Sequence, residues 1–322
     1  MSKFQKILVA TDFSDNASAV YDYTEEIAGD FEATIDLIHI INIPHYYQYS
    51  VDIHAAALPM SDFMKKEFRD KVKDKLETEF NDKIPKEHRG KTILKTGNPA
   101  DEIRNCGKEG AYDLIIIASR GEGNTIFNKG SVTEKLMRIS KTPILSVLEE
   151  SNTNLKTIIV PTDGSDVSFE ALPLVYDLAV KRNAKIKLLS ISKTNFTNAM
   201  LGEYMPYTYK DAEIKEYILR GLQEYIQGQT NTLQFKDEPK PADETYQLND
   251  QKGNSVNISI VIKKGNSAHL AVVDYAEKNG QLIVIATHGH SKLASMFVGS
   301  TTANVFRNVK IPVMTIKPDF IK

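Results

Sequence analysis

The chain has 322 residues, of which 25% are charged and 41% are hydrophobic, and its formal net charge is −2. This composition excludes disorder as the main state, and the near-neutral charge argues against bulk electrostatic attraction to nucleic acid or to an anionic membrane. No apolar stretch approaches the ~20 residues of a spanning helix, and the N-terminus lacks the apolar region of a signal peptide. The length corresponds to about two ordinary domains. With a single cysteine, we expect a cytoplasmic protein without disulfides.

Short β-branched runs alternate with amphipathic stripes along the whole chain. The apolar residues from Met64 to Phe80 recur every fourth position, as do those from Ile214 to Ile226, which predicts one helix with a core-facing side in each half. The run 114–117 is apolar on both faces, as in a central strand of a parallel sheet. The predicted strands are 6–10, 35–41, 92–95, 114–118 and 144–148, then 157–160, 185–191, 256–263, 282–286 and 312–316.

The chain repeats itself. Residues 7–15 return as 158–166, and residues 113–121 return as 281–289. We therefore predict two domains of one kind, residues 1–150 and 155–322, each a doubly wound, five-stranded parallel α/β sheet of Rossmann-like type. The second copy carries an insertion at about 227–256, whose charged, proline-containing stretch 236–244 predicts a surface loop or excursion.

Several helix starts can be read locally. Asn98 before Pro99 predicts an N-cap followed by proline at the first helical position. Ser131 and Glu134 have the spacing of a capping box. Asp12 and Asp163, each followed two residues later by serine, could serve only as caps of the first helix of each copy.

Open parallel sheets bind ligands beyond the carboxyl ends of their strands. Asp12 and Asp163 follow the first strand of each copy, and Gly130-Ser131 and Gly299-Ser300 open the last helices. A helix N-terminus with glycine and hydroxyl residues offers N–H groups to a phosphate. A structural use of these residues, in turns and caps alone, remains an alternative.

Taken together, these motifs resemble the universal stress protein family. The shared features are a strand followed by Thr-Asp-x-Ser, the segment Gly-Asn-Pro/Ser-Ala, and the loop Ala-Thr-His-Gly-x9-Gly-Ser. Their occurrence in order, twice, is similar to tandem members of that family. The resemblance implies a five-stranded parallel fold and, for nucleotide-binding members, an ATP site built on a Gly-x2-Gly-x9-Gly-Ser/Thr loop. In the second copy, Ala286 replaces the first glycine of that loop.

The resemblance implies an adenine nucleotide, ATP with or without Mg2+, as the ligand of the second copy. Asp163 and Ile191 would lie at the adenine and ribose end, and Gly299 and Ser300 would hold phosphates. The implied site residues of the second copy are Thr162, Asp163, Ile191, Ile285, Ala286, His288, Gly289, His290, Gly299, Ser300 and Thr301.

The first copy departs further from the family pattern. Its glycine loop is one residue shorter, and Glu122 stands beside the expected phosphate path, where a carboxylate repels the ligand. We therefore predict a weaker or degenerate site there. Its corresponding residues are Thr11, Asp12, Ile40, Ala118, Gly121, Gly130 and Ser131.

Two functions remain open at this stage. The first is nucleotide binding in a stress response, without catalytic residues and with at most slow ATP hydrolysis, because no nucleophile–base pair is evident. The second is a nucleotide-independent scaffold in which the fifth strands of the two copies, 144–148 and 313–316, form an internal pseudo-dimer. Protein partners or a homodimer fit either function. His288 and His290 lack a third metal ligand at a diagnostic spacing, so we predict no metal site.

Overall fold

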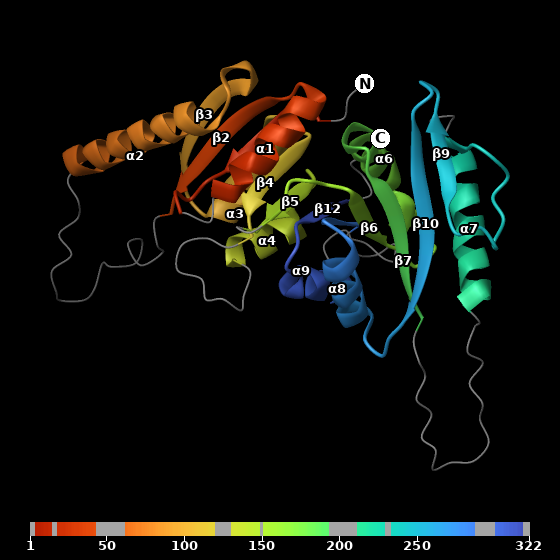
Figure 1. Cartoon of the computed structure of the whole chain (residues 1–322). Coiled ribbons are helices and arrows are strands. Elements are labelled where there is room, and N and C mark those ends of the chain that lie inside the picture. The colour runs from red at the N-terminus through yellow and green to blue at the C-terminus, as the bar shows by residue number, and fades with distance from the viewer. Residues whose placement is uncertain are drawn as a thin grey trace, which may run out of the picture.

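A computed structural model describes residues 4–14, 18–42, 62–119, 130–148, 151–192, 211–228, 233–286 and 300–317. Its first half is an open parallel sheet of strand order β3-β2-β1-β4-β5 with helices between the strands (Figure 1). The elements are β1 (Lys6–Ala10), α1 (Ser18–Phe31), β2 (Thr34–Ile41), α2 (Asp62–Lys83), η3 (Lys86–His88), β3 (Arg89–Thr96), α3 (Pro99–Glu109), β4 (Leu114–Ala118), α4 (Ser131–Ile139) and β5 (Ile144–Val147).

The second half repeats this order with five parallel strands, β10-β7-β6-β11-β12. The predicted doubly wound fold is thereby confirmed for both halves. The elements are β6 (Thr157–Pro161), α5 (Asp166–Phe169), α6 (Leu172–Arg182), β7 (Lys185–Ser192), α7 (Asp211–Gly228), β8 (Leu233–Phe235), β9 (Tyr246–Asp250), β10 (Ser255–Lys264), α8 (Ala268–Asn279), β11 (Leu282–Ala286), α9 (Ser300–Asn308) and β12 (Val313–Ile316).

The charged stretch 236–244 of the insertion is a largely exposed loop, as predicted, but the insertion as a whole is more than a loop. It contains β8 and β9, which add to β10 as antiparallel strands and extend the sheet. The alternation of Tyr246 and Leu248, both buried, with polar neighbours gives β9 one core-facing side. Gly253, with φ of +85°, makes the turn into β10, and the Asp250 carboxylate accepts the backbone N–H groups of Lys252 and Asn254.

The two halves join into one 12-stranded sheet through antiparallel pairing of β5 with β12. Leu145 lies opposite Met314, and both are at most 1% exposed. These two residues are also equivalent in the repeat, so a pseudo-two-fold axis passes between them. The pairing of the two fifth strands, one of the sequence-based hypotheses, is therefore present.

Helices cover both faces of this sheet. On one face, α1, α2, α6 and α7 enclose a single apolar core that continues from the first half into the second. On the other face, two smaller cores lie under the helix pairs α3–α4 and α8–α9. Met137 of α4 belongs to the core of the second half. The apolar packing on this face therefore also crosses the seam, the junction of the two halves at β5 and β12. None of the described helices combines the length and apolarity needed to span a membrane.

Polar contacts reinforce the seam on the face that carries the continuous core. Arg182, at the end of α6, forms ion pairs with Glu26 and Asp30 of α1. The Tyr23 hydroxyl donates to the Asn152 carbonyl in the segment between the halves. Burial raises the pKa of Asp30, and the Arg182 guanidinium opposes that shift. The relative position of the halves is thus determined by strand pairing, apolar packing and specific charge contacts.

Of the two helix starts predicted from capping motifs, the one at Asn98 is confirmed. Asn98 caps α3 by accepting the backbone N–H of Asp101, with Pro99 at the first helical position. The capping box at Ser131 is wrong, because the N-cap of α4 is Gly130 and Ser131 is already the first helical residue. Glu134 therefore lies one position too deep to reach back to the N-cap, and its carboxylate contacts arginines instead.

Because Leu145 is fully buried at the seam, we expect Leu145→Ala to destabilise the whole chain by about 2–5 kcal/mol, measured by urea unfolding. Leu270→Ala, at a side chain that is 56% exposed on α8, should change stability by less than about 0.5 kcal/mol. Equal effects of the two substitutions would contradict the central place of the seam.

Candidate functional site

The loops after β1 and β6 are built by the same hydrogen bonds. In the first half, Asp12 Oδ1 accepts the backbone N–H and the hydroxyl of Ser14, at 3.1 and 2.5 Å. In the second half, Asp163 Oδ1 accepts the same two groups of Ser165 at the same distances. Ser165 is the N-cap of α5, so the aspartate orients the capping residue rather than capping the helix itself. Each carboxylate is held at the carboxyl edge of its sheet.

The residue after each of these aspartates has a left-handed backbone. Gly164 adopts φ of +81° without steric cost, whereas its counterpart Phe13 adopts φ of +64°. Ring contacts offset the strain at Phe13. Its ring stacks on His39 with centroids 4.2 Å apart, and the Lys75 ammonium lies 4.5 Å from the ring centroid. The two halves thus keep one loop shape with different side chains.

In the second half, these elements surround a pocket of about 350 Å³. It lies beyond the carboxyl ends of β6, β7 and β11 and is bounded by the N-terminal parts of α8 and α9. All seven of the described residues predicted for this site line it. They are Thr162, Asp163, Ile191, Ile285, Ala286, Ser300 and Thr301. The predicted residues His288, Gly289, His290 and Gly299 lie outside the described residues.

The first half has the equivalent pocket, of about 320 Å³. It is bounded by the carboxyl ends of β1, β2 and β4 and by the starts of α3 and α4. The structure brings together six of the predicted residues here, Thr11, Asp12, Ile40, Ala118, Gly130 and Ser131. Gly121 lies outside the described residues.

Alanine is compatible with the position where the family motif has its first glycine. Ala118 ends β4 opposite Val147, and Ala286 ends β11 opposite Ile316, in regular parallel pairing. Neither has a positive φ. Strand geometry accepts a Cβ atom, so the replacement of glycine does not distort either pocket.

The end of each pocket nearest the last helix is rich in hydroxyl and backbone N–H groups but not in charge. Ser131 and Ser300 are the first residues of α4 and α9, where N–H groups have no intrahelical partner. The hydroxyls of Thr133 and Thr302 follow two residues later, and that of Thr133 donates to the Ala118 carbonyl. Among the described residues that line the two pockets there is no lysine or arginine. An anion there would be bound by helix N-termini and hydroxyls.

Sequence reasoning missed the wall that the third helix of each half contributes. Pro99 and Ile103 of α3 line the first pocket, and Ala268 and Val272 of α8 line the second. The repeated Gly-Asn-Pro/Ser-Ala segment was a usable signal, because it begins these helices at the same edge as the aspartates. The missed hydroxyl of Ser168, which hydrogen-bonds Thr162, had no such signal.

A polar network ties the first pocket to α2. The Thr11 hydroxyl donates to Glu79 Oε1 at 2.7 Å, and the Tyr21 hydroxyl donates to the same oxygen. His39 Nδ1 lies 2.9 Å from the Thr11 carbonyl, so this nitrogen carries the proton. Burial lowers the pKa of His39 despite the nearby carboxylates of Asp12 and Glu79. The neutral form of this histidine, which is among the residues that line the first pocket, is therefore favoured.

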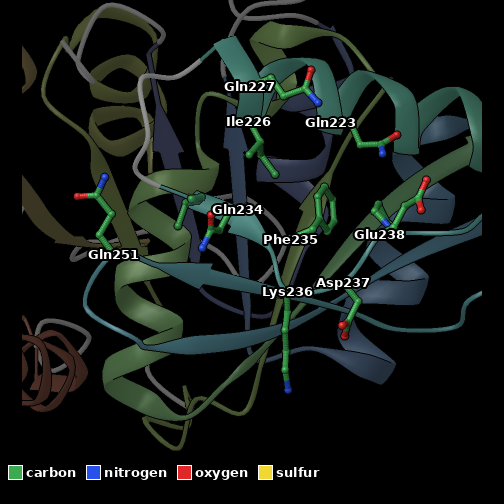
Figure 2. Close-up of a pocket in the computed structure, with 11 residues that line it drawn as sticks. Gln223, Ile226, Gln227, Gln234, Phe235, Lys236, Asp237, Glu238 and Gln251 are labelled. Carbon is green, nitrogen blue, oxygen red and sulfur yellow. The ribbon is translucent and has the colours of Figure 1, made fainter.

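A third cavity, of about 510 Å³, lies apart from both pockets, between α7 and the added hairpin (Figure 2). Figure 2 shows Gln223 and Gln227 on α7 and Gln234 on β8, with Ile226 and Phe235 between them. None of the predicted site residues lines this cavity. Within the described parts of the chain, no group of three His, Cys, Asp or Glu side chains could hold a metal ion.

Comparisons with known proteins agree with this architecture. The sequence model of the universal stress protein family matches residues 3–147 and 154–317. A universal stress protein of Synechocystis is 22% identical over 97% of this chain and its own full length. One of Bacillus subtilis is 28% identical over 45% of this chain and 99% of its own length. The crystal structure of a universal stress protein from Archaeoglobus fulgidus superposes with a TM-score of 0.67 at 20% identity, covering 99% of both chains.

Close backbone contact positions α7 against the loop that carries Asp163. A Cβ atom on Gly221 would lie 2.6 Å from the Gly164 carbonyl oxygen, so Gly221→Ala should force the helix and loop apart. We expect a destabilisation of about 1–3 kcal/mol in urea unfolding. Gly228→Ala on the same helix meets nothing within 4 Å and should be neutral or stabilising. A neutral Gly221→Ala would show that the contact is not required.

The buried neutral His39 should make stability depend on pH. The pKa of His39 in the folded protein lies below the ordinary value near 6.5. The stability that the neutral histidine contributes is therefore fully present above about pH 6.5, and it is lost as the pH falls from there through the lower pKa of the folded state. We expect the wild-type protein to lose more stability between pH 7 and pH 5 than His39→Gln, measured by urea unfolding at each pH. Parallel pH profiles for the two proteins would contradict a neutral His39.

Proposed function

The chain belongs to the universal stress protein family, as a member with two such domains, and we propose that it binds an adenine nucleotide, ATP, in the C-terminal domain. The observation that carries this proposal is the pocket beyond β6, β7 and β11, which gathers seven of the residues implied by the family motif. We place the domain boundaries at 1–150 and 155–322. A stress-response role follows from family membership.

The chemistry of the pocket supports this ligand. Leu189, Ile191 and Val272 offer an apolar surface to a base. The Asp163 carboxylate, oriented by Ser165, is suited to accept a ribose hydroxyl. At the other end, the α9 N-terminus with Ser300 and Thr301 is suited to phosphates. Apolar, acceptor and anion-binding groups thus follow one another in the order in which a nucleotide would need them.

The N-terminal domain is proposed as the weaker site. Its pocket has the same plan, but Val132 stands where the second domain has Thr301, so it offers fewer hydroxyls. Glu122, which lies outside the described residues, adds a carboxylate to the loop that would approach the phosphates. Both differences disfavour a polyphosphate.

We propose binding rather than rapid turnover. The polar side chains of the second pocket are hydroxyls and one carboxylate, which bind and orient a ligand but do not make a nucleophile–base pair. Mg2+ bound with ATP would be held mainly by the phosphates and water, as is usual for this ion. Slow ATP hydrolysis is the upper limit that these groups support.

A second candidate function is that of a scaffold, favoured by the β5–β12 pairing. This pairing covers the edges of both fifth strands within one chain, so neither edge is open for pairing with a strand of another chain. A homodimer or another protein partner would bind elsewhere, for example at the outer strands β3 and β8.

Calorimetric titration with ATP tests the nucleotide proposal. We expect Ser300→Asp, which places a carboxylate at the phosphate end of the second pocket, to weaken the tighter binding event at least tenfold. Its repeat equivalent, Ser131→Asp, is the matched control and should leave that event unchanged. Aspartate is favourable in the first turn of a helix, so both variants should fold.

Three results would contradict the proposal. Absence of heat and of a thermal shift with ATP would favour the scaffold. A larger effect of Ser131→Asp on the tighter event would reverse the ranking of the two sites. Equal loss in both variants would show that the domains do not bind independently.

A further inference from the structure

A charge cluster joins the last helices of the two domains. The Glu134 carboxylate of α4 accepts a bidentate pair of hydrogen bonds from the Arg307 guanidinium of α9. Arg307 Nη2 donates to Oε1 at 2.5 Å, and Nε donates to Oε2 at 3.1 Å. Arg138, one turn further along α4, donates to the same Oε1 at 2.7 Å. Glu134 is 21% exposed, whereas the two arginines are about half-exposed. Charge-assisted hydrogen bonds of this forked geometry hold the arginine side chain in one place.

The antiparallel seam explains why this contact falls near a pocket. Strands of the two domains run in opposite directions at β5–β12, so their carboxyl edges, and the two pockets, lie at opposite edges of the sheet. Helix α9 starts at the second pocket and runs toward the edge of the first. Arg307, in the last turn of α9, therefore meets Glu134, in the first turns of α4. Figure 1 shows helices α4 and α9 next to each other.

The cluster breaks the symmetry of the repeat. Arg138 and Arg307 are equivalent positions, but the equivalent of Glu134 is Ala303. Both arginines consequently contact the one carboxylate in the N-terminal domain. The C-terminal domain has no counterpart of this carboxylate, so any effect of the cluster on ligands applies to the first pocket.

We propose that Arg307, a residue of the C-terminal domain, is a positioning and charge-compensating residue for the phosphate end of the N-terminal pocket, acting through Glu134. This inference rests on the proposed nucleotide function and concerns its weaker site. Ser131 lines that pocket one turn before Glu134, about 4.5 Å along the helix axis, so an uncompensated Glu134 carboxylate would repel phosphates there. The pocket itself has no lysine or arginine among its described lining residues. Among the described residues, the charge of Glu134 is compensated by Arg138 and Arg307.

The contacts of the cluster stabilise the ionised form of Glu134 and lower its pKa. The hydrogen bond from Arg307, more than any other contact, lowers the pKa of Glu134. At neutral pH the carboxylate is thus ionised, and with both arginines in place the cluster carries a net charge of +1, which falls to zero without Arg307. The N-terminal site is complete only when the C-terminal domain is packed against it.

The test uses the full chain with Ser300→Asp, so that ATP binding reports the N-terminal pocket. Into this background we would introduce Arg307→Ala, Arg307→Lys, Glu134→Gln and the pair Glu134→Gln with Arg307→Ala. Arg220→Ala, at an exposed arginine of α7, serves as the control. Each protein is titrated with ATP, AMP and adenosine by calorimetry.

We expect Arg307→Ala to weaken ATP binding about threefold to tenfold, to weaken AMP binding less, and to leave adenosine binding unchanged. The reason is that the substitution alters the electrostatic interaction with the phosphates, which adenosine lacks. Arg307→Lys should retain part of the affinity. Glu134→Gln should strengthen ATP binding, and in that background Arg307→Ala should have little further effect, since the carboxylate that holds the arginine is gone.

Equal weakening of ATP and adenosine by Arg307→Ala would show a merely structural role and overturn the proposal. So would an unchanged ATP affinity in Arg307→Ala, or an equal effect with and without Glu134. Loss of all ATP binding in the Ser300→Asp background would also overturn it. That last result would leave the proposed function of the C-terminal domain intact, provided that the wild-type protein binds ATP.

Discussion

The antiparallel pairing of β5 with β12 is the constraint on which the rest of the structure depends. Each fifth strand would otherwise leave an apolar edge of backbone donors and acceptors exposed to solvent. Pairing Leu145 with Met314 satisfies both edges at once and places the repeat axis between them. The continuous core on one face of the sheet follows, because the helices of both domains then cover one surface.

The same pairing determines how the two sites relate. Since the strands of the two domains are antiparallel, the pockets lie at opposite edges, and the last helices α4 and α9 run past each other on one face. This arrangement brings a charged residue of one domain to the helix N-terminus of the other domain's pocket. Ordinary ion pairs between half-exposed groups contribute little to stability, so the value of this cluster lies in the charge that it places.

Duplicated sequence produces duplicated local structure, with informative exceptions. The Asp12 and Asp163 loops share hydrogen bonds because Thr, Asp and Ser recur at the same spacing. Phe13 and Gly164 share a left-handed backbone although only glycine would be expected there, since stacking on His39 offsets the strain in the first copy. The capping box failed because helix α4 begins one residue earlier than the motif requires, so Ser131 is the first helical residue and not the N-cap.

The sequence alone determined the strand order along the chain, the duplication, the helix cap at Asn98 and thirteen of the residues that line the two pockets. These depend on local periodicity and on spacing within a repeated unit. Tertiary structure decided that the insertion forms β8 and β9, that α3 and α8 complete the pocket walls, and that Arg307 meets Glu134 across the seam. Such contacts join residues far apart in the chain, so no local pattern carries them, and they arise only once β5 and β12 pair.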